Sequence, residues 1–310
     1  AAAAVVGVIA IAMSLKVFKG FPERYDANVQ TVLEQLVAGN PLRGSCDDYQ
    51  NVFRNDDVCN LGRHRAEGES YDVALLGDSM ADHWAPLVAM FADEKQLAFR
   101  QVTNGGCGLF FGIEVSPWPV SKTSECAAYQ RESAAFLDAN PKLKMVVLSG
   151  WWEKWLARIE HPGVNVEVPA ATSEDEARGL TAPRFDKVLK DTIETFTKRG
   201  IKVLLIGQIP TYGTLPVRCI GASVRDKVDA ARCGMTRAAA ETQLTRSNAA
   251  LKRAAATLPG VAVSQPFDYM CQEMRCSPIA DGTLLYKNGG HVNRFGAEYL
   301  RRFVEFPSLP

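Results

Sequence analysis

The sequence predicts an α/β protein, a three-layer α/β/α sandwich built on a five-stranded parallel sheet. Five short apolar runs bounded by turn residues have the pattern of strands buried on both faces, at 73–76, 98–102, 145–148, 203–206 and 261–263. Helical patterns separate them, and strands that alternate with helices form right-handed crossovers. In such sheets ligands bind beyond the carboxyl ends of the strands, so the residues after each strand are the candidates for a site.

The helices are marked by apolar residues at helical spacing. The clearest covers 185–196, where the apolar side chains share one face before Gly200 ends the helix. Others are predicted over 27–36, 80–91, 237–258 and 294–303. Two stretches, 108–127 and 151–182, are rich in proline, glycine, serine or charge, and we predict irregular loops there that form binding rims.

The composition describes a globular protein without a strong electrostatic field. With 310 residues, 47% of them hydrophobic, the chain can bury one sizeable core. Its 35 lysines and arginines balance 35 aspartates and glutamates, so no net charge attracts nucleic acid or an anionic membrane surface. We therefore expect no nucleic-acid partner.

Eight cysteines favour an oxidising compartment, the periplasm or the outside of the cell. They lack the CxxC spacing of zinc or redox sites and fall as local pairs: Cys46 and Cys59, Cys107 and Cys126, Cys219 and Cys233, Cys271 and Cys276. Short loops that each carry two cysteines fit disulfides better than reduced buried thiols. Nearest-neighbour pairing is one of many connectivities, and the sequence leaves the choice open.

The chain is predicted to consist of three parts. Residues 1–20 open with an apolar run that ends at Lys16 and Lys19. This run is shorter than the about 20 residues that span a bilayer and lacks the basic start of a signal peptide, so we expect the remnant of a transmembrane helix. A buried or signal-like helix is the alternative. Residues 21–60 form a linker or extension without a strand, and 61–310 form the catalytic domain.

A serine directly follows the first predicted strand. The run Leu76-Gly77-Asp78-Ser79-Met80 places Ser79 in a turn between a buried strand and a helix, where backbone N–H groups can stabilise an oxyanion. The simpler interpretation is that Asp78 or Ser79 caps the helix. A nucleophile needs a base from elsewhere in the chain.

His291 is the candidate base. It is one of four histidines and follows Asn288-Gly289-Gly290, just before the last predicted helix. This position lets the ring lie at the carboxyl edge of the sheet, beside Ser79. A loop histidine alone is more often a surface residue. Together with the serine turn it indicates a Ser-His site for acyl transfer.

Further candidates follow the second and third strands. Gly105 and Gly106 offer backbone N–H groups for an oxyanion hole, although a tight turn explains them equally well. Trp151 and Trp152 have aromatic faces that stack on sugar rings or pack in the core. The sequence lacks Walker, GxGxxG, HExxH and EF-hand motifs, so we expect no metal and no nucleotide chemistry.

These motifs resemble those of SGNH (GDSL-type) hydrolase domains, in particular the periplasmic kind fused to the C-terminus of acyltransferase-3 membrane proteins that O-acetylate polysaccharides. The resemblance covers about residues 45–305. The Gly77-Asp78-Ser79 turn is similar to the first family block. The segment from Asp281 to His291 is similar to the last block, which ends in the catalytic histidine, and the cysteines just upstream are also similar to that subgroup.

The resemblance implies an SGNH-hydrolase-like, flavodoxin-like fold and an O-acetyltransferase. Ser79 would hold or transfer the acyl group, His291 would act as general base and acid, and Gly105 or Gly106 would share the oxyanion hole with the Ser79 N–H. This domain would bind no cofactor, because the absent acyltransferase-3 membrane domain would handle acetyl-CoA. The implied location is the periplasmic side of the inner membrane, and the implied acceptor is a polysaccharide or glycolipid: O-antigen, lipopolysaccharide or exopolysaccharide.

Two positions depart from the family pattern. The family places an Asp three residues before its catalytic histidine, where this chain has Asn288. An amide can orient an imidazole but cannot offset the imidazolium charge, and in one serine triad the change from Asp to Asn costs about 10⁴ in rate. Either Asn288 serves, or Asp281 substitutes, or the site is a poor catalyst. The Asn of the third family block is also missing, since Ser149-Gly150-Trp151-Trp152 stands there.

Two other functions stay open. One is a secreted carbohydrate esterase or deacetylase that uses the same residues with water as acceptor. The other is a glycan-binding domain in which Asn288 marks a decayed triad and Trp151, Trp152 and Trp155 hold the sugar.

Overall fold

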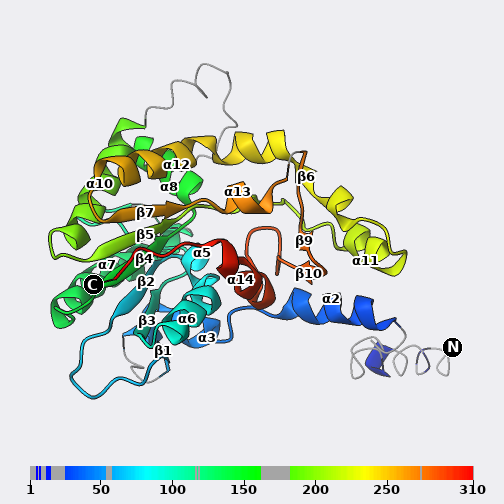
Figure 1. Ribbon diagram of the computed structural model, residues 1–310, viewed down its shortest axis with the longest axis horizontal. Coiled ribbons are helices and arrows are strands. Elements are labelled where there is room, and N and C mark those ends of the chain that lie inside the picture. Colours follow the sequence, from blue (N-terminus) through cyan, green and yellow to red (C-terminus); the bar gives the residue numbers. More distant parts are fainter. Residues whose placement is uncertain are drawn as a thin grey trace.

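The central sheet has six strands (Figure 1) in the computed structural model, which describes residues 5, 7, 12–14, 25–53, 58–115, 117, 119–161, 182–272 and 274–309. In spatial order the strands are β1 (Asn60–Gly62), β3 (Ala98–Thr103), β2 (Val73–Gly77), β4 (Met145–Ser149), β5 (Lys202–Ile206) and β7 (Val261–Ser264). The last five are parallel, which confirms the five predicted strands.

The sixth strand corrects the predicted count of five. The short β1 pairs antiparallel with β3 at the edge of the sheet. Its sequence, Asn60-Leu61-Gly62, contains no β-branched or aromatic residue, so nothing local marks it as a strand. The segment is a strand because it pairs with β3.

Two hydrophobic cores lie on the two faces of the sheet, because successive strand side chains point to opposite faces. Val73 and Leu75 belong to one core, and Ala74 and Leu76 to the other. Helices of the first core are α2 (Ala27–Val37), α6 (Ala85–Glu94), α11 (Val217–Arg225) and α14 (Arg294–Leu300). Helices of the second are α7 (Thr123–Ala139), α8 (Trp152–Glu160), α10 (Pro183–Thr197) and α12 (Arg237–Thr257). This confirms the three-layer sandwich.

Smaller elements complete the described chain. They are α3 (Arg43–Cys46), α4 (Tyr49–Val52), α5 (Ser79–Asp82), η2 (Val120–Lys122), η3 (Ala230–Cys233), β6 (Met235–Thr236), α13 (Pro266–Met270), β8 (Arg275–Cys276), β9 (Ile279–Ala280), β10 (Thr283–Leu284) and η4 (Arg301–Phe303). The single helix predicted over 80–91 is in fact α5 followed by α6. Pro86 stands in the first turn of α6, where its missing N–H costs nothing, so the chain starts a new helix there.

The two predicted irregular stretches are partly helical. The first ends in α7, and the second begins with α8. Trp152, Trp155, Leu156 and Ile159 of α8 are buried at helical spacing, a pattern that the loop-like composition of the whole stretch obscured. Residues 162–181 of the second stretch lie outside the described residues.

Four disulfides join the eight cysteines as nearest neighbours. The pairs are Cys46–Cys59, Cys107–Cys126, Cys219–Cys233 and Cys271–Cys276. This confirms the local pairing that the spacing suggested. Each bridge closes a short loop and thereby restricts the unfolded chain.

The segment before β1 packs on the sandwich. Val32 and Val52 lie in the two cores, and Cys46 is bridged to Cys59 just before β1. The Gln35 side chain accepts a hydrogen bond from the Leu284 N–H at 2.7 Å. Within the described part of the chain, no helix combines the length and apolar character needed to cross a membrane. Most of residues 1–20, predicted as a transmembrane remnant, lie outside that part.

Tyr129 of α7 holds the ends of β2 and β3 together. Its buried hydroxyl lies 3.0 Å from the carbonyl oxygen of Gly77 and 2.9 Å from that of Val102, and it accepts from the Gly77 N–H at 3.1 Å. Gly77 has φ +136°, and a Cβ there would lie 1.9 Å from the carbonyl oxygen of Ser149. Only glycine fits this close approach, so any other residue at position 77 would force the turn after β2 to move.

We predict that Tyr129→Phe lowers the free energy of unfolding by about 1–3 kcal/mol, because buried backbone groups at the ends of two strands lose their partner. Denaturant unfolding measures the change. Tyr299→Phe, which removes an exposed hydroxyl bonded to Asp281, is the matched control and should change stability by less than about 0.5 kcal/mol. Equal effects of the two substitutions would contradict the role given to Tyr129.

Candidate active site

Ser79, His291 and Asn288 form a hydrogen-bonded line. Nε2 of His291 lies 3.0 Å from Oγ of Ser79, and Nδ1 lies 3.0 Å from Oδ1 of Asn288. Ser79 is the first residue of α5, at the carboxyl end of β2, and His291 lies in the loop before α14. The serine and the histidine are 212 positions apart, so only the fold brings them together.

The neighbouring Asp78 caps α5 and leaves the serine hydroxyl to His291. Its Oδ1 accepts from the Met80 N–H at 2.7 Å, and its Oδ2 accepts from the Trp151 N–H at 2.9 Å and from the indole of Trp155. Burial raises the pKa of the Asp78 carboxyl, and these donors oppose the rise. Of the two residues that the sequence offered as caps, Asp78 therefore has that role.

Asn288 holds the imidazole in the tautomer that a base requires. Its Oδ1 also accepts from the backbone N–H groups of Gly290 and His291, each at 2.9 Å. Because backbone N–H groups only donate, the amide atom that faces them and the ring is the oxygen, and Nδ1 carries the hydrogen. Nε2 then directs its lone pair at the hydroxyl of Ser79. The wrong tautomer that an asparagine can impose on a triad is thus avoided.

Asp281 does not take the third position, which corrects the alternative that the sequence left open. Its exposed carboxylate accepts from the Tyr299 hydroxyl at 2.9 Å and pairs with Arg302 at 2.8 Å. The Nδ1 atom of His291 faces Asn288 instead. Asp281 adopts φ +47° in a turn at the surface, and its carboxylate contacts α14 and η4 instead of the active site.

Burial keeps His291 neutral. Desolvation lowers the pKa of its imidazole to about 4, and the positive charges of Arg43 and Lys287 act in the same direction. Asn288 is uncharged and offers no compensation. The ring is therefore unprotonated near neutral pH, which is the form that accepts a proton from Ser79.

A second imidazole packs against the first. The rings of His83 and His291 meet edge to face, with centroids 5.8 Å apart and planes at 88°. Burial lowers the pKa of His83 well below its usual value, and the neighbouring His291 and Arg43 add to the effect. His83 follows Ser79 by four positions, one helical turn, and this spacing was the sequence signal that could have identified it.

The glycines predicted for the oxyanion hole lie beside the serine turn. Asn104, which follows β3, donates from its N–H to the Gly77 carbonyl at 3.0 Å. The Gly105 N–H lies 3.5 Å from the Asp47 carbonyl oxygen, at the outer limit of a hydrogen bond. Gly106 has φ +83°, which glycine adopts at low cost. Both glycines reach the same sheet edge as Ser79, and their role as donors stays a prediction.

A cleft of about 610 Å³ lies on one side of His291. It is lined by residues of the serine turn, the histidine loop, the segments after β4 and β5, and α12: Met80, Trp151, Thr211, Tyr212, Gly213, Gln243, Asn288, Gly289, Gly290 and His291. A Cβ on Gly289 would lie 2.1 Å from the Tyr212 carbonyl oxygen, so glycine permits the close contact between these two loops.

Of the tryptophans proposed to hold a sugar, Trp151 lines this cleft. Its ring is partly exposed, with Nζ of Lys154 3.4 Å from the ring centroid. The prediction for Trp152 is wrong: the side chain is 2% exposed and its indole N–H donates to the Ile206 carbonyl at 2.8 Å. Trp155 is also buried and bonds to Asp78. Both pack in the core because α8 turns them toward the sheet.

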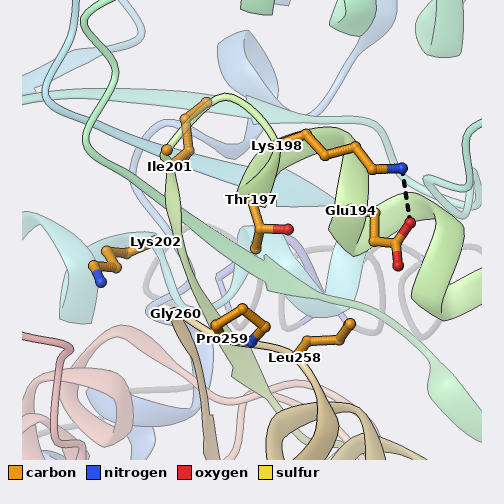
Figure 2. A pocket seen from close by; sticks show the side chains of 9 residues that line it. Glu194, Thr197, Lys198, Ile201, Lys202, Leu258, Pro259 and Gly260 are labelled. Atoms are coloured by element: carbon orange, nitrogen blue, oxygen red, sulfur yellow. Dashed lines mark hydrogen bonds and ion pairs between the residues drawn. The ribbon is translucent and has the colours of Figure 1, made fainter.

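Another cavity, of about 390 Å³, lies at the opposite end of the sheet, between the C-terminal turn of α10 and the start of β7. Figure 2 shows Lys198 and Glu194 paired at its rim. Its described lining contains no serine, histidine or cysteine. The cleft beside His291 is therefore the candidate substrate-binding site.

We predict that the His291 ring titrates with a midpoint near pH 4 in an NMR experiment, and that Asn288→Asp raises this midpoint. A carboxylate accepts the same backbone N–H groups and in addition stabilises the imidazolium. Asn28→Asp on the exposed surface of α2 is the matched control and should leave the midpoint in place. An unchanged midpoint in Asn288→Asp would mean that residue 288 does not face the ring.

The fold and the motifs agree with known proteins. The family model described as SGNH domain (fused to AT3 domains) matches residues 45–306. The periplasmic domain of a lipopolysaccharide acetyltransferase from Salmonella ser. Paratyphi A aligns over 86% of this chain and 97% of that chain, with 13% identity and a TM-score of 0.52. A protein of Bacteroides fragilis NCTC 9343 proposed to be an acylhydrolase aligns over 85% of this chain and 93% of that chain, with 14% identity and a TM-score of 0.39.

The likeness to the Salmonella domain concerns the fold alone, because the identity is low. No curated protein matches the chain. The family model covers most of the sequence, including the serine turn and the histidine loop, and so the chain belongs to the family of SGNH domains that are fused to AT3 domains.

Proposed function

We propose that this chain transfers an acetyl group to a hydroxyl of a cell-surface polysaccharide through Ser79 and His291. The observation that carries the proposal is the 3.0 Å contact between Nε2 of His291 and Oγ of Ser79. A serine hydroxyl is a weak nucleophile until a base takes its proton, and here the base is adjacent, neutral and held in the correct tautomer by Asn288.

The reaction proceeds in two half-reactions. Oγ of Ser79 forms a bond to the acyl carbonyl carbon while its proton passes to Nε2 of His291. That proton then leaves with the donor's leaving group, and an acyl-serine remains. In the second half, a sugar hydroxyl oxygen attacks the acyl carbon and gives its proton to His291. Ser79 recovers the proton as the ester of the sugar departs.

The oxyanion of each half-reaction needs donors. The N–H of Ser79 lies at the start of α5, and the loosely held N–H of Gly105 or that of Gly106 lies in the adjacent loop. We assign these groups to the oxyanion hole. The asparagine that the wider family places in its third block is absent from this chain, so the backbone supplies the stabilisation.

Three observations favour a membrane-linked transferase at the periplasmic face of the inner membrane. The family is described as fused to AT3 domains, and the Salmonella domain with the same fold is the periplasmic part of a lipopolysaccharide acetyltransferase. Four disulfides suit an oxidising compartment. In this proposal an acyltransferase-3 membrane domain handles acetyl-CoA, and the acceptor is O-antigen, lipopolysaccharide or exopolysaccharide.

The acceptor sugar is assigned to the cleft beside His291. Trp151 offers a ring face at the wall of this cleft, and aromatic faces stack on the apolar faces of sugar rings. His291 lines this cleft and its Nε2 lies 3.0 Å from Oγ of Ser79, so a hydroxyl bound there is close to the base.

Ser79→Ala and His291→Gln should each abolish acetylation of the cell-surface polysaccharide in cells that produce the protein. In the purified chain, hydrolysis of p-nitrophenyl acetate should fall by about 10³-fold or more, because the nucleophile or its base is lost. Ser124→Ala, on the exposed side of α7, is the matched control and should behave like the parent. Acetylation that persists in Ser79→Ala would exclude Ser79 as the nucleophile.

Trp151→Ala should raise KM for an oligosaccharide acceptor about tenfold and leave hydrolysis of p-nitrophenyl acetate nearly unchanged. The substitution removes the stacking face but keeps the backbone N–H that bonds to Asp78. Trp151→Phe should retain part of the affinity. If acceptors neither accelerate acyl release nor become acetylated, water is the acceptor and the chain is an esterase.

A further inference from the structure

Arg43, from the segment before β1, lies between two carboxylates close to the serine turn. Its Nη1 is 3.3 Å from Oδ2 of Asp82, and its Nη2 is 3.6 Å from Oδ2 of Asp47. The Asp82 and Asp47 side chains are 0% and 5% exposed, whereas that of Arg43 is 34% exposed. A guanidinium carries its donors in a rigid fork, so one cation can face both carboxylates.

Asp82 belongs to the helix that carries the nucleophile. It is the last residue of α5, which Ser79 begins. Its Oδ1 accepts from the side-chain amides of Asn40 at 2.6 Å and Gln101 at 3.0 Å. The Asp82 carboxylate thus ties α5 to the extension and to β3 at once.

Asp47 lies next to Gly105, a residue of the loop that is predicted to supply the oxyanion hole. Its carbonyl oxygen faces the Gly105 N–H at 3.5 Å, and its Oδ2 lies 3.0 Å from the place that a Cβ on Gly105 would occupy. Through its two carboxylate partners, Arg43 therefore links the helix of Ser79 to the loop of Gly105.

The two carboxylates depend on this cation. Burial raises the pKa of both Asp47 and Asp82, and the charge of Arg43 opposes the rise. Without a cation, two close buried carboxylates do not both stay ionised, and an uncompensated buried charge is strongly destabilising. Loss of Arg43 would therefore protonate or displace a carboxylate that now holds α5.

We propose that Arg43 is a positioning residue of the active site, a role that rests on the proposed function of Ser79 and His291. It fixes the helix of the nucleophile relative to the loop of the oxyanion donors. The extension that supplies Arg43 is then part of the active site and more than a linker.

The charge of Arg43 also acts on the base. It disfavours the protonated form of His291, as does the charge of Lys287. The groups that face or act on the ring from the elements packed around it are Ser79, His83, Asn288, Lys287 and Arg43. Since the first three are neutral, removal of Arg43 leaves less positive charge nearby, and protonation becomes easier. The acid limb of activity should then move to higher pH.

Two substitutions, Arg43→Gln and Arg43→Lys, distinguish the positioning effect of Arg43 on kcat from the effect of its charge on the pKa of His291. Measured on p-nitrophenyl acetate, Arg43→Gln should lower kcat about tenfold or more and raise the pH of the acid limb by about half a unit or more. Arg43→Lys should keep the parent acid limb and still lower kcat, because an ammonium group cannot face both carboxylates as a fork does. The midpoint of the His291 ring, followed by NMR, should move only in Arg43→Gln.

Arg199→Gln is the matched control. The Arg199 side chain is 39% exposed and pairs with Asp138 near the amino end of β5, at the end of the sheet opposite the active site. It should leave kcat and the acid limb at the parent values. Both substitutions remove an ion pair. A difference in kcat between Arg199→Gln and Arg43→Gln therefore comes from the position of Arg43 beside the active site.

The proposal is overturned if Arg43→Gln keeps kcat within about twofold of the parent and the acid limb in place. Should that variant not fold, Arg43→Lys carries the test, and a parent kcat there overturns the proposal. Ser79→Ala distinguishes the two proposals. An active Ser79→Ala defeats the proposed function, while an inactive one beside unaffected Arg43 variants defeats the role of Arg43 alone.

Discussion

The contact between His291 and Ser79 depends on a tight joint at the carboxyl end of β2. Gly77 passes so close to the Ser149 carbonyl that no side chain fits, and Tyr129 holds the strand ends from the other layer. Asp78 then caps α5, which directs the serine hydroxyl out of the helix toward the histidine loop. This joint fixes the position of Ser79, which the site requires because its base, His291, comes from the far end of the chain.

The third member of the site separates two tasks that an aspartate performs together. An aspartate orients the imidazole and also compensates its positive charge. Asn288 performs the first task, since two backbone donors fix its amide oxygen toward Nδ1. The second task is left undone, and the buried ring has a pKa of about 4. The base is correctly placed and unprotonated, but its conjugate acid is poorly stabilised.

The active site consists of a neutral group of side chains with a cluster of charged residues next to it. Ser79, His83, His291 and Asn288 form a neutral inner group. Arg43, Asp47 and Asp82 stand behind it as a compact ion cluster that joins the extension to α5. Because the cluster is largely buried, its members depend on one another more than surface ion pairs do. The extension therefore contributes electrostatics as well as packing.

By itself the sequence determined the five parallel strands, the helices over 27–36, 185–196 and 237–258, the serine turn and the histidine loop, since each depends on the preferences of neighbouring residues. It favoured the local cysteine pairs without excluding other connectivities. Tertiary structure decided the rest. The sequence left both Asn288 and Asp281 as candidates for the third position, and the loop geometry turned Asn288 to the ring. Trp151 and Trp152 are adjacent, yet the first turn of α8 buries one and leaves the other at the cleft. Arg43 and β1 carry no local signal, because their roles come from partners distant in sequence.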